Sequence, residues 1–276
     1  MAAVRVLVLR GPGINCDEET VLGWQMAGAE PQLLHVNRLV ERPGVLEEFQ
    51  ILTVPGGFSY GDDIAAGAVF ASVLRDRLAA PLRRFVDAGG GVLGICNGFQ
   101  ILVKAGLLPG PGVDVRVTVT FNDSARFEAR WVRLQVATDR CVYLRAGSTL
   151  ELPVEHGEGR VITDGDVSTG ALERGGYVAV RYVGDDGRPA GYPENPNGSV
   201  AGIAGLCDAT GRVFGLMPHP DRFLFPTNHP QWTRRGADAP ADGLTVFRSA
   251  VEYWTQNGKQ SGSQGVRESG SQGVSE

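Results

Sequence analysis

The sequence lacks the features that mark secreted, membrane-spanning or metal-clustered proteins. It has only four cysteines and four histidines, and no two cysteines form a C-x-x-C pair. We therefore expect neither a disulfide framework nor a metal site. No apolar run approaches the length of a membrane span, and the first residues are too strand-like for a signal peptide. A cytoplasmic location fits this composition best.

A large excess of charge is also absent. The 276 residues include 26 Lys and Arg against 31 Asp and Glu, a net charge of -5. This balance gives no electrostatic reason to expect a nucleic-acid partner or a membrane surface. The G-x-x-x-x-G-K-[ST] pattern of a phosphate-binding loop is missing as well. We therefore expect no ATP chemistry and no cofactor in this chain.

The first half alternates apolar, strand-like segments with helix-like ones. Strands are predicted at 4–9, 31–36, 50–54 and 91–95, with helices at 16–28 and 69–88. Such alternation predicts an α/β fold with a mostly parallel central sheet flanked by helices. Sites in these sheets lie beyond the carboxyl ends of the strands, where Gly56, Gly57 and Cys96 stand.

The second half is richer in strand-like segments. Strands are predicted at 113–120, 127–136, 177–183, 200–206 and 212–217, a loop at 192–199 and a closing helix at 244–254. We predict one domain over residues 1–258. Residues 259–276 contain a near-exact duplication of eight residues that cannot bury a core, and we predict a low-complexity, disordered tail.

The run Gly94-Ile-Cys-Asn-Gly-Phe-Gln100 is the most informative motif. A cysteine framed by glycines between a strand and a helix has the form of a nucleophile elbow. The helix that follows points N–H groups and its dipole at the sulfur, which favours thiolate and can hold an oxyanion. Taken alone, Cys96 could equally be a small buried hydrophobe.

A base for such a nucleophile is offered by Met217-Pro-His-Pro-Asp221. His219 lies just past a predicted core strand, and Asp221 stands two residues later. In an extended segment this spacing puts both side chains on one side, so the carboxylate can accept from the imidazole. An isolated H-P-D would more often be a surface turn, but beside a nucleophile elbow it favours function.

With these motifs the chain resembles the class I (triad) glutamine amidotransferases, whose pattern is G-x-C-x-G-x-Q followed far downstream by H-x-E. It is most similar to the glutaminase subunits of phosphoribosylformylglycinamidine synthase, the PurQ family. The resemblance covers residues 4–255 in family order. It is carried by 11–17, 55–62, 94–100, 122–128, 156–160, 192–199 and 217–221.

The resemblance implies a flavodoxin-like fold and a role for each matched residue. Cys96 would attack the glutamine side-chain amide, His219 would act as base, and Asp221 would orient it. The backbone of Gly57 and Asn97 would hold the oxyanion. The implied substrate-binding residues are Gly56, Phe58, Gln100, Asn122, Ser124, Arg126 and Phe127.

The resemblance also implies partners and a division of labour. Ammonia would pass to a separate ATP-dependent synthetase subunit (PurL-like), with ATP and magnesium on that partner and a small bridging subunit (PurS-like) between them. The glycine-rich, charged context of His156 predicts an exposed loop, and the resemblance suggests that this surface faces the synthetase. We expect Cys16, Cys141 and Cys207 to be structural.

The family pattern has Glu where this chain has Asp221, so the carboxylate is shorter by one methylene. We expect a working enzyme in which the His–carboxylate contact is weaker or the loop is shifted. The stretch from Phe223 to Arg235 looks like an extension to the family pattern.

Three other functions compete with this interpretation. The chain could be the glutaminase of another amination pathway, such as cytidine or guanine nucleotide synthesis, although 56–62 and 195–199 favour the purine enzyme. A redox or chaperone-like protein with the same sheet would leave His219, Asp221 and Gln100 without a role. A catalytically silent regulatory module is disfavoured by the complete triad.

Overall fold

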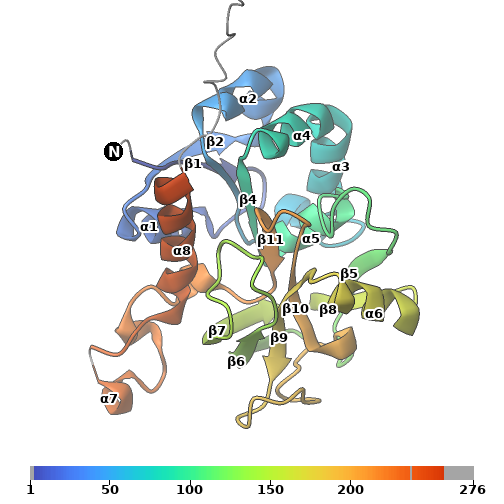
Figure 1. Cartoon of the computed structure of the whole chain (residues 1–276), viewed down its shortest axis with the longest axis vertical. Coiled ribbons are helices and arrows are strands. Elements are labelled where there is room, and N and C mark those ends of the chain that lie inside the picture. The colour runs from blue at the N-terminus through green and yellow to red at the C-terminus, as the bar shows by residue number, and fades with distance from the viewer. Residues whose placement is uncertain (1–2, 237, 258–276) are drawn as a thin grey trace, which may run out of the picture.

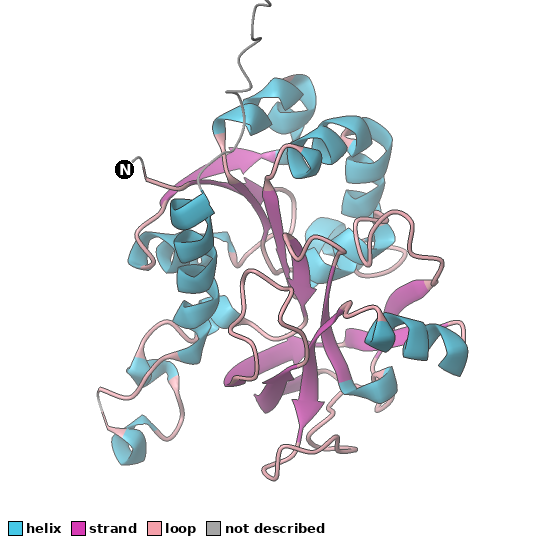
Figure 2. Ribbon diagram, viewed as in Figure 1, coloured by secondary structure: helices cyan, strands magenta, loops and turns pink. Residues whose placement is uncertain are grey.

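The structure is a computed structural model that describes residues 3–236 and 238–257, so the predicted tail lies outside the described residues. In this part of the chain the strands form a nine-stranded sheet and a separate two-stranded sheet. The order of the large sheet is β2-β1-β3-β4-β11-β10-β9-β6-β7. Figures 1 and 2 show its strands running through the molecule with helices on either side.

The first five strands in that order are parallel and form the core of the fold. They are β2 (Glu30–His35), β1 (Arg5–Arg10), β3 (Ile51–Val54), β4 (Gly91–Ile95) and β11 (Val213–Leu216). Every residue of β3, β4 and β11 is buried. Strands covered on both faces lose the alternation of apolar and polar residues, which explains their continuous apolar sequences.

The sheet continues with antiparallel strands from the second half of the chain. These are β10 (Ile203–Cys207), β9 (Val178–Val183), β6 (Glu128–Val136) and β7 (Thr149–His156). The small antiparallel sheet pairs β5 (Val117–Phe121) with β8 (Glu158–Thr163). Residues 192–199 form the predicted loop.

Helices cover the parallel strands from two sides (Figure 1). On one side lie α1 (Asp17–Met26) and α8 (Asp242–Asn257), and Trp24 meets Phe247 edge to face with ring centroids 4.9 Å apart. On the other side lie α3 (Ala68–Arg77), α4 (Ala79–Asp87) and α5 (Asn97–Lys104). Shorter helices are α2 (Val36–Glu41), α6 (Asp166–Arg174) and α7 (Trp232–Arg235), and 3-10 turns occur at Pro43–Glu48, Ser59–Asp62, Val200–Gly202, Pro220–Arg222 and Pro226–Asn228.

The predicted α/β class is confirmed, but parts of the element assignment were wrong. The single helix predicted at 69–88 is two helices that meet at Leu78. Pro81 has no N–H to continue an existing helix, but it is tolerated in the first turn of a new one. The predicted strand at 113–120 shrinks to β5, and β7, β8 and α6 were not predicted. β7 was missed because it contains Pro153, which argues against a strand. The proline is tolerated there because β7 is an edge strand.

Candidate active site

Cys96 alone makes the turn between β4 and α5. Its backbone has φ 51° and ψ -105°, a left-handed conformation that is strained for any residue with a side chain. The Cys96 N–H donates to the Leu216 carbonyl at 2.8 Å, and α5 begins at the next residue. The turn geometry of an elbow is therefore present, with Cys96 buried at the carboxyl edge of the sheet, and its role as nucleophile stays a prediction.

The two glycines that frame Cys96 allow the close packing of this turn. A Cβ on Gly94 would lie 2.7 Å from the carbonyl oxygen of Gly98. A Cβ on Gly98 would overlap the carbonyl oxygen of Val54, at the end of the neighbouring strand β3. The elbow therefore needs glycine at both positions because backbone from two strand ends passes against α5.

The topology brings His219 to the same edge. In the register of the parallel strands β4 and β11, Ile95 faces Leu216, so the segments that follow both strands leave the sheet together. The His219 N–H donates to the Pro153 carbonyl at 2.8 Å, which attaches the segment to β7. His219 Nδ1 lies 3.2 Å from Asp221 Oδ1, and both side chains are buried. The predicted pairing of these two residues is present despite the shorter carboxylate.

Electrostatics favour a charged imidazole at this position. Burial by itself lowers the pKa of His219, but the neighbouring Cys96 and the Asp221 carboxylate outweigh it and raise that pKa well above its ordinary value. A protonated imidazole next to a cysteine favours the thiolate form of the sulfur. The arrangement therefore favours a protonated His219 next to Cys96.

The segment after β3 lies beside the elbow. Gly57 has φ 143° and forms an antiparallel bridge with Ile14. The hydrogen bonds of this bridge come from flanking residues, since the Phe58 N–H donates to Gly13 at 2.8 Å and the Cys16 N–H to Gly56 at 3.3 Å. Asn97 opens α5, where a backbone N–H has no acceptor inside the helix. Both N–H groups predicted to hold an oxyanion are thus free of these ladder and helix bonds.

The Asn97 side chain links the loop after β3 to the first turn of α5. Its Oδ1 accepts from the Ser59 N–H at 3.2 Å, and its Nδ2 donates to Asp62 at 3.1 Å and to Gln100 at 2.9 Å. Gln100 in turn donates to the Glu158 carbonyl. The loop from Gly57 to Asp62 therefore has a defined position relative to the start of α5.

The seven predicted substrate-binding residues differ in burial and in their contacts. Gln100 and Asn122 are buried and use their amides internally, Asn122 donating to the carbonyls of Arg126 and His156. Ser124 donates to Glu128 at 2.8 Å, whereas Arg126, Phe127 and Phe58 are exposed. Gly56 lies against the triad, because a Cβ there would be 2.8 Å from His219 Cε1. Their role in binding glutamine stays a prediction.

Two acidic residues near the elbow were not predicted. Asp62 accepts from the Gly67 N–H at 3.3 Å, and Glu158 accepts from the Ala66 N–H at 3.2 Å, so both hold the start of α3. Burial and the nearby Glu158 raise the pKa of Asp62, and burial lowers the pKa of Lys104 on α5. Asp62 follows directly on the Gly-Gly-Phe-Ser-Tyr-Gly run, which was the signal available in the sequence.

The expectation that His156 lies in an exposed loop was wrong. His156 is the last residue of β7 and is buried, with Nδ1 3.1 Å from Asn122 Oδ1. Because the Asn122 amide nitrogen already donates to two carbonyls, Nδ1 must carry the proton. Burial and the nearby His219 lower the pKa of His156 to about 3. Apolar residues at 150, 152 and 154 put His156 on the buried face by their period of two.

The segment from Phe223 to Arg235, whose role the sequence left open, packs against β6 and β7. His229 lies 4.5 Å from Trp131, ring centroid to ring centroid, and its Nε2 is 3.3 Å from a Glu151 carboxylate oxygen. Arg235 reaches the same carboxylate at 2.8 Å. This segment therefore supports the loop that carries His219 and Asp221.

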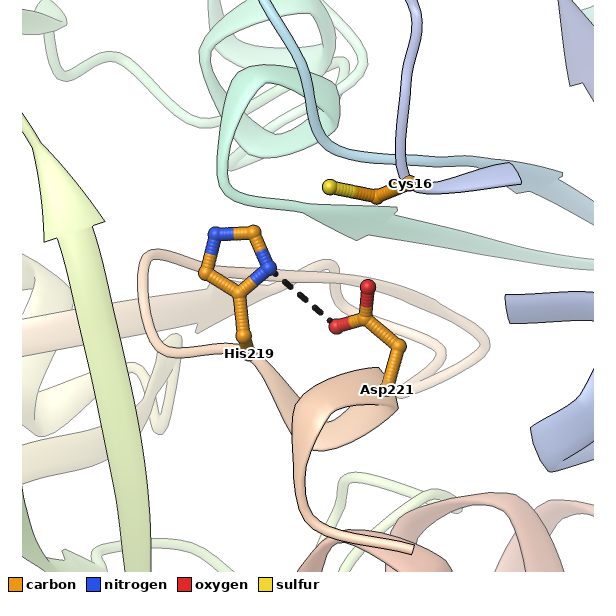
Figure 3. Close-up of side chains that lie close together, drawn as sticks. All are labelled: Cys16, His219 and Asp221. Carbon is orange, nitrogen blue, oxygen red and sulfur yellow. Dashed lines mark hydrogen bonds and ion pairs between the residues drawn. The ribbon is translucent and has the colours of Figure 1, made fainter. Parts of the chain in front are cut away.

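Cys16, expected to be structural, lies beside the triad. It precedes α1, and its sulfur accepts from the Arg222 guanidinium at 3.4 Å. Figure 3 shows Cys16 lying against His219 and Asp221, which come from one segment far from Cys16 in the sequence. In the described part of the chain these three form a group of ligand atoms within 4.8 Å of one another. The signal in the sequence was the position of Cys16 after the first strand, at the same edge of the sheet.

A cysteine on a strained strand-to-helix turn, with a buried His–carboxylate pair beside it, defines a thiol hydrolase or transferase site on a doubly wound α/β sheet. The described helices include none with the length and apolar character needed to cross a membrane.

Comparison with known proteins shows which family within this class the chain matches. Residues 3–254 match the family described as the CobB/CobQ-like glutamine amidotransferase domain. The chain is 45% identical over 259 residues to phosphoribosylformylglycinamidine synthase subunit PurQ of Dehalococcoides mccartyi, covering 93% of this chain and 100% of that protein. It is 39% identical over 268 residues to the PurQ subunit of Archaeoglobus fulgidus, covering 91% of this chain and 97% of that protein.

A solved structure agrees with this family. The PurLQS structure from Thermotoga maritima contains a chain 31% identical to this one, with a TM-score of 0.68, covering 91% of this chain and 99% of that chain. The chain belongs to the glutamine amidotransferase family and, within it, to the PurQ family.

Proposed function

We propose that this protein is the glutaminase subunit of phosphoribosylformylglycinamidine synthase, a cytoplasmic enzyme that hydrolyses glutamine and passes the ammonia to a synthetase. The observation that carries the proposal is the strained Cys96 elbow beside the buried His219–Asp221 pair. The names of its relatives supply the pathway. The other amination pathways have no comparable support, because the relatives named here are all PurQ subunits.

In the first step the Cys96 thiolate attacks the side-chain amide carbon of glutamine. The thiol proton resides on His219 Nε2, since Nδ1 faces Asp221. Asp221 acts on the reaction only through His219, by holding the ring in the orientation that presents Nε2. The raised pKa of His219 means that this proton transfer costs little before attack.

The negative charge that develops on the amide oxygen needs fixed donors. The backbone N–H groups of Gly57 and Asn97 would supply them. Asn97 has two functions in this scheme, because its side chain also binds the Ser59 N–H and so holds Gly57 in position. Preorganised donors of this kind typically contribute about 100- to 1,000-fold in rate each.

The tetrahedral intermediate collapses when His219 protonates the departing nitrogen, which releases ammonia and leaves a γ-glutamyl thioester on Cys96. His219 then removes a proton from water, and the resulting attack releases glutamate and regenerates the thiolate. Gly56, Phe58, Gln100 and the Asn122–Phe127 turn are the proposed walls of the glutamine subsite.

Ammonia would be consumed by a synthetase subunit of the PurL type, which would supply ATP and magnesium, with a PurS-type subunit in the assembly. A PurLQS assembly from Thermotoga maritima supports this composition. Phe58, Phe121 and Phe127 are about half exposed or more, at 47%, 66% and 54%, and lie on the segments around the elbow. Docking there would bury them and couple hydrolysis to synthesis.

The test is covalent labelling by a diazoketone analogue of glutamine, followed by intact-mass analysis and peptide mapping. We expect one adduct, on Cys96, that is absent from the Cys96→Ser variant and present in Cys207→Ser. Ammonia release from glutamine should be slow in the isolated chain and faster with a PurL-type synthetase and a PurS-type subunit. No adduct in the isolated chain or in that assembly would refute the proposal and favour a silent binding module.

A further inference from the structure

The thiol of Cys16 has no part in the glutaminase mechanism, yet it lies against the catalytic pair. Cys16 Sγ, a ring nitrogen of His219 and a carboxylate oxygen of Asp221 all lie within 4.8 Å of one another. Nδ1 is the ring nitrogen that faces Asp221, so we take Nδ1 as the His219 atom of this group. Tetrahedral zinc bonds of about 2.0–2.3 Å separate ligand atoms by about 3.3–3.7 Å. Small side-chain movements therefore bring the three atoms to coordination distance.

The Asp221 carboxylate also carries an unsatisfied acceptor. Asp221 Oδ2 is buried and has no hydrogen-bond partner within the described residues. Figure 3 shows this second oxygen on the side of the carboxylate that faces Cys16. A buried carboxylate oxygen without a partner is costly, and a bound cation would satisfy it.

A surface cleft reaches one member of this group, Asp221. It has a volume of about 420 Å³ and is lined by Asp221 and Arg222 together with Glu19 and Glu155. Arg222 is close to the Cys16 sulfur at 3.4 Å and to carboxylate oxygens of Glu19 and Glu155 at 3.3 Å and 3.5 Å. Glu19, Glu155, Asp221 and a Cys16 thiolate outnumber the Arg222 guanidinium and the His219 imidazolium, and this excess of negative charge favours a divalent cation.

We propose that Cys16, His219 and Asp221 form a binding site for Zn²⁺ on the Nδ1 side of the His219 ring. Thiolate, imidazole and carboxylate are the three ligand types that zinc takes in proteins, and a water molecule would complete the tetrahedron. Binding releases the Cys16 thiol proton and the Nδ1 proton of His219 to solvent. Gly56 keeps the space beside the site open, because a Cβ there would lie 3.2 Å from the Cys16 sulfur.

The consequence for catalysis rests on the proposed function. A metal on His219 Nδ1 replaces the hydrogen bond to Asp221 and leaves the remaining ring proton on Nε2. The imidazole can then no longer accept the proton of Cys96. Zinc is therefore an inhibitor of glutamine hydrolysis that acts without occupying the glutamine subsite.

Direct metal binding tests the site independently of any activity. Co²⁺ is titrated into the full chain, and the thiolate-to-metal charge-transfer absorption is recorded, with Zn²⁺ added in competition. We expect one tight site in the wild type and in Cys96→Ala and Cys207→Ala. In Cys16→Ala the absorption should disappear and the affinity for Zn²⁺ should fall by at least about 100-fold. Circular dichroism checks that each variant is folded.

Two outcomes overturn the proposal. Loss of the absorption in Cys96→Ala with its retention in Cys16→Ala would place the metal on the nucleophile instead. No binding at micromolar metal in the wild type would exclude the site. If Cys16→Ala does not fold, His219→Asn takes its place, and retained binding with unchanged affinity there refutes the proposal equally.

Inhibition is measured separately. Zn²⁺ should lower glutaminase activity in the wild type, and Cys16→Ser should require at least about 100-fold more Zn²⁺ for the same effect. A chain that binds Co²⁺ through Cys16 but shows no glutaminase activity even with the PurL-type and PurS-type subunits would refute the proposed function and leave the metal site standing. Equal inhibition of both proteins would refute the inhibitory role of the site.

Discussion

At the scale of single residues, the three side chains of the triad have unequal tasks. In the proposed mechanism Cys96 would make and break the covalent bond, His219 would move every proton, and Asp221, whose Oδ1 lies 3.2 Å from His219 Nδ1, would act only through His219. The ring of His219 is also held by its buried surroundings and by the Cys16 contact. Loss of the orienting acid should therefore cost less than loss of either of the other two.

The first prediction follows from this difference. Cys96→Ala and His219→Asn should each lower the turnover of glutamine by about a million-fold. Asp221→Asn should lower the turnover less, by about 10,000- to 100,000-fold, since nucleophile and base remain. Steady-state glutamate release in the synthetase assembly measures all three, with Cys207→Ala as a control that keeps full turnover. Equal loss in the three variants would contradict the assigned roles.

The second prediction concerns the stability contributed by His156. Its pKa is about 3 in the folded protein against 6.5 when exposed, because burial disfavours the charged form. Between these values the unfolded state binds more protons, so stability rises with pH across this window and is lost as pH falls from 6.5 toward 3. The slope due to this residue is about 1.4 kcal/mol per pH unit.

Urea denaturation of the wild type and of His156→Gln at several pH values measures this slope. The variant should be less stable at neutral pH, but its free energy of unfolding should depend less steeply on pH below 6.5. Parallel curves for the two proteins would show that His156 titrates normally in the folded state.

At the scale of elements, the elbow depends on close contact between α5 and the end of β3. Gly98 lies in the first turn of α5, and a Cβ there would overlap the Val54 carbonyl oxygen. Alanine favours helix formation over glycine by about 1 kcal/mol, but backbone overlap costs more than that. Sterics therefore outweigh helix propensity at this position.

The third prediction is that Gly98→Ala lowers the free energy of unfolding by about 1–3 kcal/mol and displaces Cys96. Activity should fall by at least about 100-fold, because small misplacements of the nucleophile are costly. Gly44→Ala is the matched control, since no atom would lie within 4 Å of its Cβ, and it should change stability by less than about 0.5 kcal/mol. Two variants of equal stability would contradict the steric argument.

At the scale of the whole molecule, helices α1 and α8, from opposite ends of the described chain, pack together on one face of the sheet. Phe247 of α8 is fully buried against Trp24 of α1, and Trp254 donates to the Gly89 carbonyl at 3.1 Å before β4. These contacts join residues more than 150 positions apart, so folding of the parallel core depends on both ends of the described chain.

The fourth prediction is that Phe247→Ala lowers the free energy of unfolding by about 3–5 kcal/mol, through lost burial and a residual cavity. Arg248→Ala, one residue later on the exposed side of α8, should change it by less than about 0.5 kcal/mol. Urea denaturation followed by tryptophan fluorescence compares the two. Similar losses would mean that α8 stabilises the fold by helix formation alone.

The α/β class and the elbow could be predicted from the sequence because both depend on local patterns. β4 is an unbroken apolar run that ends in Gly-x-Cys-x-Gly, and the turn has no room for other residues. The pairing of His219 with Asp221 was predictable for the same reason, since it spans only two positions.

The elements that were missed or misassigned depend on contacts distant in sequence. β7 contains Pro153, which argues against a strand until its place at the sheet edge is known. His156 looks like a loop residue from its glycine neighbours, but Asn122, 34 positions away, and the β7 register bury it. The division of 69–88 into two helices was, by contrast, visible in Pro81.

The cluster around Cys16 shows where local pattern stops being informative. Nothing in the spacing of residues 16, 219 and 221 suggests a common site, because more than 200 positions separate the cysteine from the other two. They meet because β1, β4 and β11 lie parallel in one sheet and their carboxyl ends share an edge. The predicted nucleophile, Cys96, was visible in its local sequence. Its surroundings depend on the strand order, which is set by the packing of the whole chain, so only the tertiary structure decided them.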